Sequence, residues 1–273
     1  MALRGKLGFI GGGRMGEALI QGLLKSGLIT AEDILATDPV ADRRVYLADT
    51  YGVNTYDSTE DKHVWAGCAT VILAVKPQIM KDVLQEAQDR INDSHLLISI
   101  AAGIRSSFIN ANLPGCNCRI IRVMPNTPAF VLEAASALSK GPRATQEDMD
   151  TAVTIFNSIG KSVILEEKYF DAVTGLSGSG PAYVFTFIEA LIDAGLKVGL
   201  NRTDAELLVM QTVLGSVKLA MHSKEHPAQL RAMVTSPGGT TIAGLHELEA
   251  AGFNGIIMNA VEAATERSKE LGQ

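Results

Sequence analysis

The first half of this sequence alternates short apolar runs with segments of helical periodicity, and no other feature restricts the fold as strongly. Six runs rich in β-branched and aliphatic residues read as strands, at residues 6–11, 33–38, 69–77, 95–103, 118–125 and 160–167. They lack a polar face, as expected of parallel strands that helices cover on both sides. The β-α-β order therefore predicts an α/β fold with a doubly wound parallel sheet of Rossmann type.

The strand pattern stops after Glu167, and the remaining chain carries helical patterns. Apolar residues recur three and four apart over residues 180–200, 203–222, 227–234 and 254–271. We therefore expect a dinucleotide-binding domain at residues 1–166 and an all-helical domain at residues 167–273. Residues 183–196 and 207–219 are apolar nearly all round, and so small a domain is expected to need a second subunit to bury them.

The composition argues against several kinds of partner. The chain has 273 residues, of which 47% are hydrophobic and 20% charged, and this is typical of a soluble globular protein. A formal net charge of -6 argues against binding to nucleic acid or to an anionic membrane, because both require a basic surface. No apolar run reaches the length of a membrane span or of a signal-peptide core. A cytoplasmic protein is expected.

The spacing of cysteine and histidine gives no metal or disulfide signal. Cys116 and Cys118 form a C-x-C pair and Cys68 stands alone, a pattern that fits reduced thiols. His222 and His226 are four residues apart, as in a helical metal site, but a proline follows directly and no third ligand is near in sequence. These histidines are assigned to surface or packing roles, and no metal is expected.

A glycine cluster follows the first expected strand and opens a helical segment. Gly11, Gly13 and Gly16 have the G-x-G-x-x-G spacing of a dinucleotide-binding turn. In such a turn the first glycine permits the tight turn, the second lets the backbone approach a pyrophosphate, and the third lets the helix pack closely on the strand. The helix amides then face the anion. The expected cofactor-binding residues here are Ile10, Gly11, Gly12, Gly13, Arg14 and Met15.

The end of the second expected strand leaves the choice of cofactor open. Asp38 stands where an acidic side chain binds the ribose hydroxyls of NAD and repels an added phosphate. Arg43 and Arg44 follow and are able to neutralise the phosphate of NADP, although a solvated helix face explains both arginines equally well. Both NAD and NADP are therefore expected as cofactors.

Turn-forming residues also precede a helical pattern near the C-terminus, in the stretch SPGGTT. Pro237 fixes its backbone angle, Gly238 and Gly239 permit a turn without Cβ clashes, and Thr240 or Thr241 is expected as the N-cap of the next helix. An ordinary glycine-rich connection would explain the loop in isolation. Beside a dinucleotide fold, free amides in the first helical turn favour a site for a small carboxylate.

Six blocks of the sequence resemble those of the pyrroline-5-carboxylate reductases, which make L-proline in the last biosynthetic step. The blocks are GFIGGGRMGEAL near the start, ILAVKPQ at residues 72–78, SIAAGI at 99–104, MPNTPA at 124–129, GLSGSGPAY at 175–183 and SPGGTTIAGLHELE at 236–249. They span essentially the whole chain in the family's order, and the last two are more specific than the glycine turn.

The resemblance implies a nicotinamide-dependent reductase with a Rossmann domain and a helical domain that forms a homodimer, with dimers often assembling into a decamer. Further cofactor contacts are implied at Ala74, Val75, Lys76, Pro77, Ile100, Ala101 and Ala102. Substrate contacts are implied at Glu167, Ser236, Gly239, Thr240 and Thr241. The implied catalytic residue is Thr241, whose counterpart hydrogen-bonds the ring nitrogen.

Two positions depart from the family's pattern. Asp38 replaces a residue that is often serine, threonine or asparagine, which puts a preference for NADP in doubt. Met233 replaces an asparagine that touches cofactor or substrate in other members, so one polar contact is expected to be missing.

A cyclic imino acid suits the expected site, because hydride from a nicotinamide adds to the imine carbon while the ring nitrogen is protonated or hydrogen-bonded. Two other enzyme classes stay open: a reductase of another cyclic imine, and a β-hydroxyacid dehydrogenase with Lys197 as its acid-base group. A nucleotide-sensing protein without turnover is the alternative outside the enzymes, and the intact SPGGTT loop weighs against it.

Overall fold

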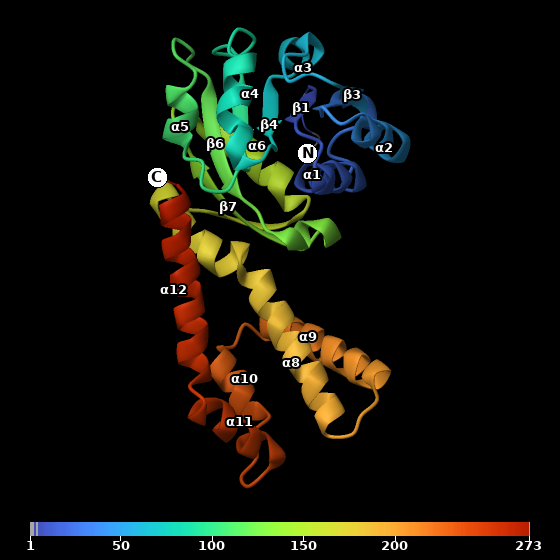
Figure 1. Ribbon diagram of the computed structural model, residues 1–273, viewed down its shortest axis with the longest axis vertical. Helices are drawn as coiled ribbons and strands as arrows, with labels where there is room; N and C mark the ends of the chain where they lie inside the picture. Colours follow the sequence, from blue (N-terminus) through green and yellow to red (C-terminus); the bar gives the residue numbers. More distant parts are fainter. Residues whose placement is uncertain (1–2, 4, 273) are drawn as a thin grey trace. The chain divides into compact units, whose positions relative to one another are not determined.

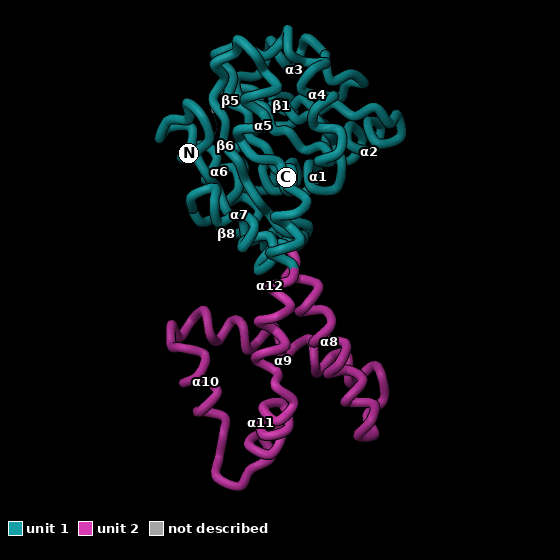
Figure 2. Tube along the Cα trace, turned by 60° about the vertical axis from the view of Figure 1, so that its left-hand side comes forward, with its two compact units in different colours: residues 1–178, 264–273 teal, residues 179–263 magenta. Residues whose placement is uncertain are grey.

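The computed structural model of the chain describes residue 3 and residues 5–272, and it divides into two compact units. Unit 1 contains Met1–Gly178 together with Ala264–Gln273, and unit 2 contains Ser179–Ala263 (Figure 2). The sheet lies in unit 1, whereas unit 2 is helical.

This division does not coincide with the expected domain boundary between residues 166 and 167. Two side-chain hydrogen bonds explain why segments beyond residue 166 stay with unit 1. Asn126 Nδ2 donates to Ser177 O at 3.0 Å, and Ser268 Oγ donates to Asp171 Oδ1 at 2.7 Å. The chain therefore leaves and re-enters unit 1 through segments that are fastened to it.

The sheet of unit 1 has eight strands, in the order β3-β2-β1-β4-β5-β6-β7-β8 (Figure 1). Their bounds are β1 Leu7–Ile10, β2 Ile34–Thr37, β3 Asn54–Tyr56, β4 Thr70–Leu73, β5 Leu96–Ser99, β6 Arg119–Met124, β7 Ala134–Lys140 and β8 Gly160–Ile164. Neighbouring strands are parallel throughout, except that β6 and β7 are antiparallel. The expected doubly wound, mostly parallel sheet is confirmed, and its strand order reverses at β1.

Two strands have no counterpart among the expected runs. β3 is a three-residue edge strand, NTY, without a buried side chain, so no apolar pattern marks it. β7 has the sequence AASALSK, in which small residues of weak β-propensity lie in a strand that is mostly buried. Because β7 runs against β6, the run of parallel strands from β3 ends at β6, and β7 and β8 form a second parallel pair.

Helices cover both faces of the sheet, which gives unit 1 three layers. One hydrophobic cluster joins the sheet to α1 (Arg14–Lys25), α2 (Ala41–Tyr51) and α6 (Gln146–Asn157). A second cluster joins it to α3 (Lys62–Gly67), α4 (Met80–Ala87) and α5 (Ser106–Ala111). Along β4, Ile72 belongs to the first cluster and Val71 and Leu73 to the second. This two-sided burial is what the apolar runs indicate.

Short helical turns complete unit 1, and longer helices build unit 2. The turns are η1 Ala31–Asp33, η2 Pro77–Ile79, η3 Thr127–Val131, η4 Glu167–Tyr169, α7 Phe170–Val173 and the π-helical η5 Thr174–Gly178. The helices are α8 Gly180–Lys197, α9 Arg202–Ser223, α10 Pro227–Met233, α11 Thr240–Ala250 and α12 Phe253–Leu271, the last of which ends in unit 1.

Unit 2 leaves most of its apolar side chains exposed. Every residue of Ser179–Ala263 is described, and Ala205 is the only one that is buried. Phe185 is 64% exposed, Leu207 69% and Met258 70%. Apolar surface of this extent is typical of a face that another protein surface covers.

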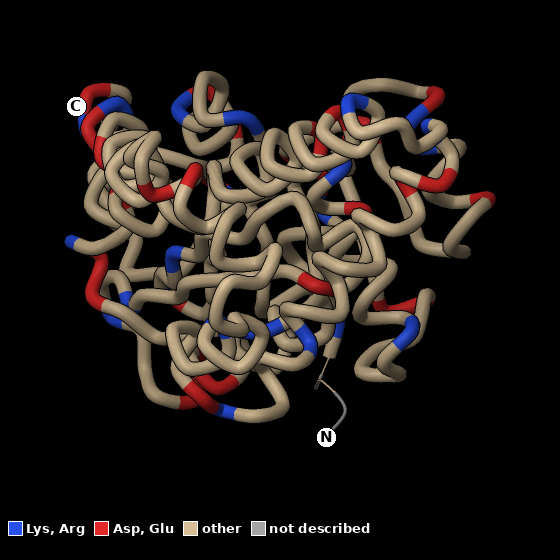
Figure 3. Tube along the Cα trace, turned by 90° about the horizontal axis from the view of Figure 1, so that it is seen from below, with Lys and Arg blue, Asp and Glu red and all other residues tan. Residues whose placement is uncertain are grey.

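Lys and Arg are interspersed with Asp and Glu along the described chain, as Figure 3 shows. Across residues 3 and 5–272, no helix combines the length and the apolarity needed to cross a membrane.

The contact of α1 with the turn after α6 generates a stability prediction. A Cβ at Gly22 would lie 2.4 Å from Ile159 Cγ2 and 2.8 Å from Ser158 O, and the main-chain oxygen has little freedom to move. We expect Gly22→Ala to lower the free energy of unfolding by about 1–3 kcal/mol, measured by urea denaturation. At Gly67 a Cβ would meet no atom closer than 3.9 Å, so Gly67→Ala is the control and should cost nothing. Equal stability of the two variants would contradict the packing described here.

Candidate functional site

The carboxyl ends of β2, β1, β4 and β5 form one edge of the sheet, where the loops expected to bind a cofactor meet. Ala74 N, directly after β4, donates to Ile10 O at 2.8 Å, and Ile100 N, directly after β5, donates to Leu73 O at 3.2 Å. These bonds place the loops after β1, β4 and β5 side by side. This is the point at which the strand order reverses, where doubly wound sheets bind their ligands.

Two of the three glycines of the turn after β1 have a steric reason in the structure, and the third lies open. Gly11 has φ +101°, and a Cβ there would lie 2.7 Å from Ala74 O. A Cβ at Gly16 would lie 2.7 Å from Gly11 O, so this glycine brings α1 close to the turn. A Cβ at Gly13 would meet no protein atom within 4 Å, so the backbone there is open to a ligand.

The N-terminus of α1 offers main-chain donors at this edge. Its N-cap is Gly13, and no side chain caps it within the described chain. Hydrogen bonding inside the helix starts with Glu17 N, which donates to Gly13 O at 2.9 Å. The amides of Arg14, Met15 and Gly16 are therefore left for an anion, and the helix dipole favours one.

A cavity of about 390 Å³ lies beside the glycine turn, which is a size typical of ligand pockets. Asp38 lines it, with Oδ2 accepting from Gly12 N at 3.0 Å and Oδ1 from Val40 N at 2.9 Å. Thr37 Oγ1 also belongs to the lining residues, is buried, and has no hydrogen-bond partner in the described chain. The donors, the acceptors and the open glycine fit the adenosine and pyrophosphate parts of a dinucleotide.

The remaining expected cofactor residues differ in their exposure. Ile10 is fully buried in the core, so only its main chain reaches the edge. Val75 lines the cavity, whereas Lys76 and Ala102 are exposed. Ala101 is buried, and its N–H donates to Ser99 Oγ at 3.4 Å.

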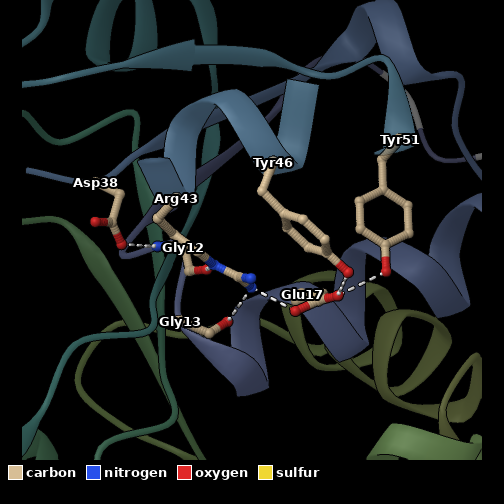
Figure 4. A network of polar contacts seen from close by, with 7 residues as sticks. All are labelled: Gly12, Gly13, Glu17, Asp38, Arg43, Tyr46 and Tyr51. Carbon is tan, nitrogen blue, oxygen red and sulfur yellow. Dashed lines mark hydrogen bonds and ion pairs between the residues drawn. The ribbon is translucent and has the colours of Figure 1, made fainter. Parts of the chain in front are cut away.

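The structure adds residues to this edge that the sequence did not mark. Asp57, Ser58 and Thr59 follow β3 and line the cavity. They carried no signal because β3 itself has no apolar pattern. Arg43 lies against the glycine turn and forms an ion pair with Glu17, which sequence spacing does not predict (Figure 4).

Glu167, expected to hold the substrate, is tied to the interior of unit 1. Its Oε1 accepts from Ser106 N at 2.8 Å and from Arg122 Nη1 at 3.1 Å, and its Oε2 accepts from the Ser106 hydroxyl. Arg122 is buried, and its guanidinium lies 4.7 Å from the centre of the Phe170 ring. Burial lowers the pKa of Arg122 below its ordinary value, which the bond to Glu167 opposes. Glu167 is thus the counter-charge of a buried arginine.

The other expected substrate residues lie in unit 2, at the start of α11. Gly238 has φ +67°, and Gly239 N donates to Ser236 O at 3.1 Å. A Cβ at Gly239 would meet the Ser236 hydroxyl, which would have to rotate away, and would lie 3.2 Å from Ser236 O. A cavity of about 390 Å³ lies beside this turn, with His246 and Glu249 on its wall.

The expectation that Thr240 or Thr241 is the N-cap of this helix is wrong. The N-cap is Gly239, in an extended conformation, and α11 begins at Thr240. No side chain caps this helix in unit 2, because glycine at the N-cap position has no side chain to accept from the first amides. The first amides of α11 are therefore open to a carboxylate, and both threonine hydroxyls stay free of a capping role.

The cysteines lie away from both sites. Cys68 and Cys118 are buried, and burial raises the pKa of the Cys68 thiol to about 11 and that of Cys118 to about 12. Thiols of such high pKa are unreactive at neutral pH. No group of three His, Cys, Asp or Glu side chains that could hold a metal ion occurs within residues 3 and 5–272.

Two family models match the chain. Residues 6–103 match the model described as NADP oxidoreductase coenzyme F420-dependent, and residues 167–271 match the model for pyrroline-5-carboxylate reductase dimerisation. The pyrroline-5-carboxylate reductase of Methanosarcina acetivorans is 46% identical to this chain over 269 residues, which are 98% of each protein.

Solved structures of pyrroline-5-carboxylate reductases also match nearly the whole length of this chain. The pyrroline-5-carboxylate reductase of Coxiella burnetii has a TM-score of 0.93 at 34% identity, covering 99% of this chain and 100% of that one. The pyrroline carboxylate reductase of Plasmodium falciparum, solved with NADP bound, has a TM-score of 0.88 at 37% identity and covers 100% of both chains.

The open position at Gly13 generates a prediction that separates ligand binding from folding. Its φ of -62° and ψ of -177° suit serine, which is also a good N-cap. We expect Gly13→Ser to keep or raise the melting temperature while weakening the binding of NADH and NADPH about tenfold or more, measured by calorimetry. Gly11→Ser should lower both the melting temperature and the cofactor affinity, because φ at Gly11 is positive and a Cβ there would clash with Ala74 O. Tight cofactor binding by Gly13→Ser would show that the ligand lies elsewhere.

Proposed function

Because this chain belongs to the pyrroline-5-carboxylate reductase family, we propose that it reduces 1-pyrroline-5-carboxylate to L-proline with hydride from NADH or NADPH. This reaction is the last step of proline biosynthesis. Two features found in one chain support the proposal. One is the open glycine turn at the sheet edge, and the other is the N-terminus of α11 in the stretch SPGGTT, which no side chain caps. The first suits a dinucleotide and the second suits the carboxylate of a small substrate.

The chain's part in the reaction is to hold the two reactants and to stabilise charge. The nicotinamide of the bound cofactor supplies the hydride. We assign the cofactor to the residues of the glycine turn, to Asp38, and to the loops at residues 74–77 and 100–102. The open amides of α1 would hold its pyrophosphate.

The substrate residues belong to the start of α11. The amides of Thr240 and Thr241 would hold the substrate carboxylate, with Ser236 and Gly239 shaping the turn. The Thr241 hydroxyl would hydrogen-bond the ring nitrogen, which gains electrons as hydride adds to the imine carbon. We keep Glu167 among the proposed substrate residues in a positioning role, since its two oxygens already accept from Ser106 and Arg122.

Assembly is the second part of the proposal. We assign residues 167–273 to substrate binding and dimerisation, with a homodimer as the unit and a decamer as its further assembly. The match to the dimerisation model and the exposed apolar side chains of α8 and α9 support this. Light scattering of the purified protein should give the mass of a dimer or a multiple of it, and a monomer would contradict the assignment. A cytoplasmic location is also proposed.

The alternatives predict different behaviour. A β-hydroxyacid dehydrogenase would use Lys197, which is exposed in the last turn of α8. A nucleotide sensor would bind cofactor without turning over a substrate. The full-length match to pyrroline-5-carboxylate reductases argues against both.

The test is the oxidation of NADH and NADPH followed by absorbance when pyrroline-5-carboxylate is added, with the six-membered ring homologue and a β-hydroxyacid assayed in parallel. We expect rapid oxidation with the five-membered ring. Absence of oxidation by folded protein that binds the cofactor would favour the sensor. Activity restricted to another substrate would reassign the enzyme.

The Thr241 hydroxyl generates a separate prediction. Thr241→Ala should lower kcat about a hundredfold, the order expected when one donor to a developing charge is lost. The melting temperature should stay unchanged, because this side chain does not cap α11. Thr241→Ser restores the hydroxyl and should recover most of the rate. Full activity of the alanine variant would remove Thr241 from the site.

A further inference from the structure

Glu17 collects three donors beside the glycine turn, and none of them comes from its own helix (Figure 4). Arg43 Nη2 forms an ion pair with Glu17 Oε2. The hydroxyls of Tyr46 and Tyr51 donate to Glu17 Oε1 at 3.0 and 2.8 Å. The guanidinium of Arg43 also lies 5.0 Å from the centre of the Tyr46 ring. Three side chains of α2 therefore surround the Glu17 carboxylate of α1.

Arg43 is held in contact with the turn that meets the cofactor. Its Nε donates to Gly12 O, and its Nη2 lies 3.5 Å from Gly13 O. A cofactor bound at this turn would therefore have Arg43 among its neighbours. The charge of Arg43, however, is matched by Glu17, whose side chain is only 20% exposed.

Glu17 stays ionised at neutral pH. Partial burial raises the pKa of its carboxyl, but the hydrogen bonds from Arg43, Tyr51 and Tyr46 outweigh burial and hold the pKa below its usual value. The same contact acts on its partner, since burial and then the bond to Glu17 raise the pKa of Tyr51. Tyr51 therefore remains a neutral donor, and the pair of opposite charges persists.

The cavity beside the glycine turn is lined by acids. Asp38, Asp57, Asp82 and Glu86 are among its lining residues, and no Lys or Arg is. Arg44, the other arginine of α2, donates from Nη1 to the main-chain oxygens of Asp38 and Pro39. With Arg43 compensated, the lining of this cavity is net negative, and such a lining favours a ribose hydroxyl over a phosphate dianion.

We infer that Glu17 is a positioning residue that sets cofactor preference, by holding Arg43 away from the 2′ position so that Asp38 alone faces the adenosine ribose. NADH is then preferred to NADPH, and Glu17 controls this without touching either. The inference rests on the proposed function only in requiring that a nicotinamide dinucleotide binds at this edge.

The test measures binding of the adenosine half by calorimetry, using AMP and adenosine 2′,5′-bisphosphate as probes, with NADH and NADPH alongside. Wild-type protein should bind AMP at least as tightly as the bisphosphate. Glu17→Gln should raise the affinity for the bisphosphate relative to AMP about tenfold, the order of one hydrogen bond to a charged group. Arg43→Ala should leave the wild-type ratio unchanged but abolish the gain in the Glu17→Gln background.

Glu86→Gln is the matched control, because it removes one negative charge from the lining of the cavity without releasing an arginine. Its effect on the ratio should be smaller and independent of Arg43. Equal shifts in the two glutamine variants, or a wild-type preference for the bisphosphate that Arg43→Ala removes, would overturn the inference. If Glu17→Gln has a lower melting temperature than wild-type protein, the single variant Arg43→Ala still tests the inference. A change in its ratio of bisphosphate to AMP affinity would overturn the inference.

Failure of this inference is distinguishable from failure of the proposed function. The binding ratios concern the adenosine pocket and need no pyrroline substrate. Oxidation of both cofactors with pyrroline-5-carboxylate but no change of ratio in Glu17→Gln would refute the inference alone.

Discussion

The close contact between Gly11 and Ala74 is the constraint on which the site of unit 1 depends. The backbone leaves β1 with a positive φ at Gly11 and passes so near Ala74 O that no side chain fits between them. Gly16 then brings α1 against the same turn. Together these contacts aim the free amides of α1 at the edge where the strand order reverses, and the loops after β4 and β5 close around them.

Sequence patterns predicted this arrangement where burial forces a pattern on the residues. Strands buried on both faces are apolar throughout, so β1, β2, β4, β5 and β6 were visible as runs, and the glycine spacing marked the turn. β8 was also visible as an apolar run, although none of its residues is buried. β3 was not predicted because it is short and has no buried residue, and β7 was not predicted because it consists mainly of alanine and serine. The N-cap of α11 was misassigned because threonine and glycine are about equally common there, so the sequence does not fix which residue precedes the first helical turn. The helix begins earlier than expected, with Gly239 as its N-cap.

Side-chain pairings across long sequence separations were beyond prediction. Glu17 meets Arg43, and Glu167 meets Arg122, only because α1 packs beside α2 and because η4 packs beside β7, the neighbour of β6. The motif MPNTPA has a comparable explanation. Asn126 donates to Ser177 O and accepts from Ala135 N, so it links β7 to the turn η5 from which the chain enters unit 2. No periodicity encodes such contacts, although they determine how charged groups are placed around the cofactor edge.

The central claim is that hydride passes from a nicotinamide to the imine carbon of pyrroline-5-carboxylate on this protein. The most direct measurement is mass spectrometry of proline formed with cofactor deuterated at both hydrogens of the nicotinamide C4. We expect one deuterium per proline, located at the ring carbon next to nitrogen and away from the carboxylate. Proline free of deuterium, or deuterium at any other carbon, would contradict it.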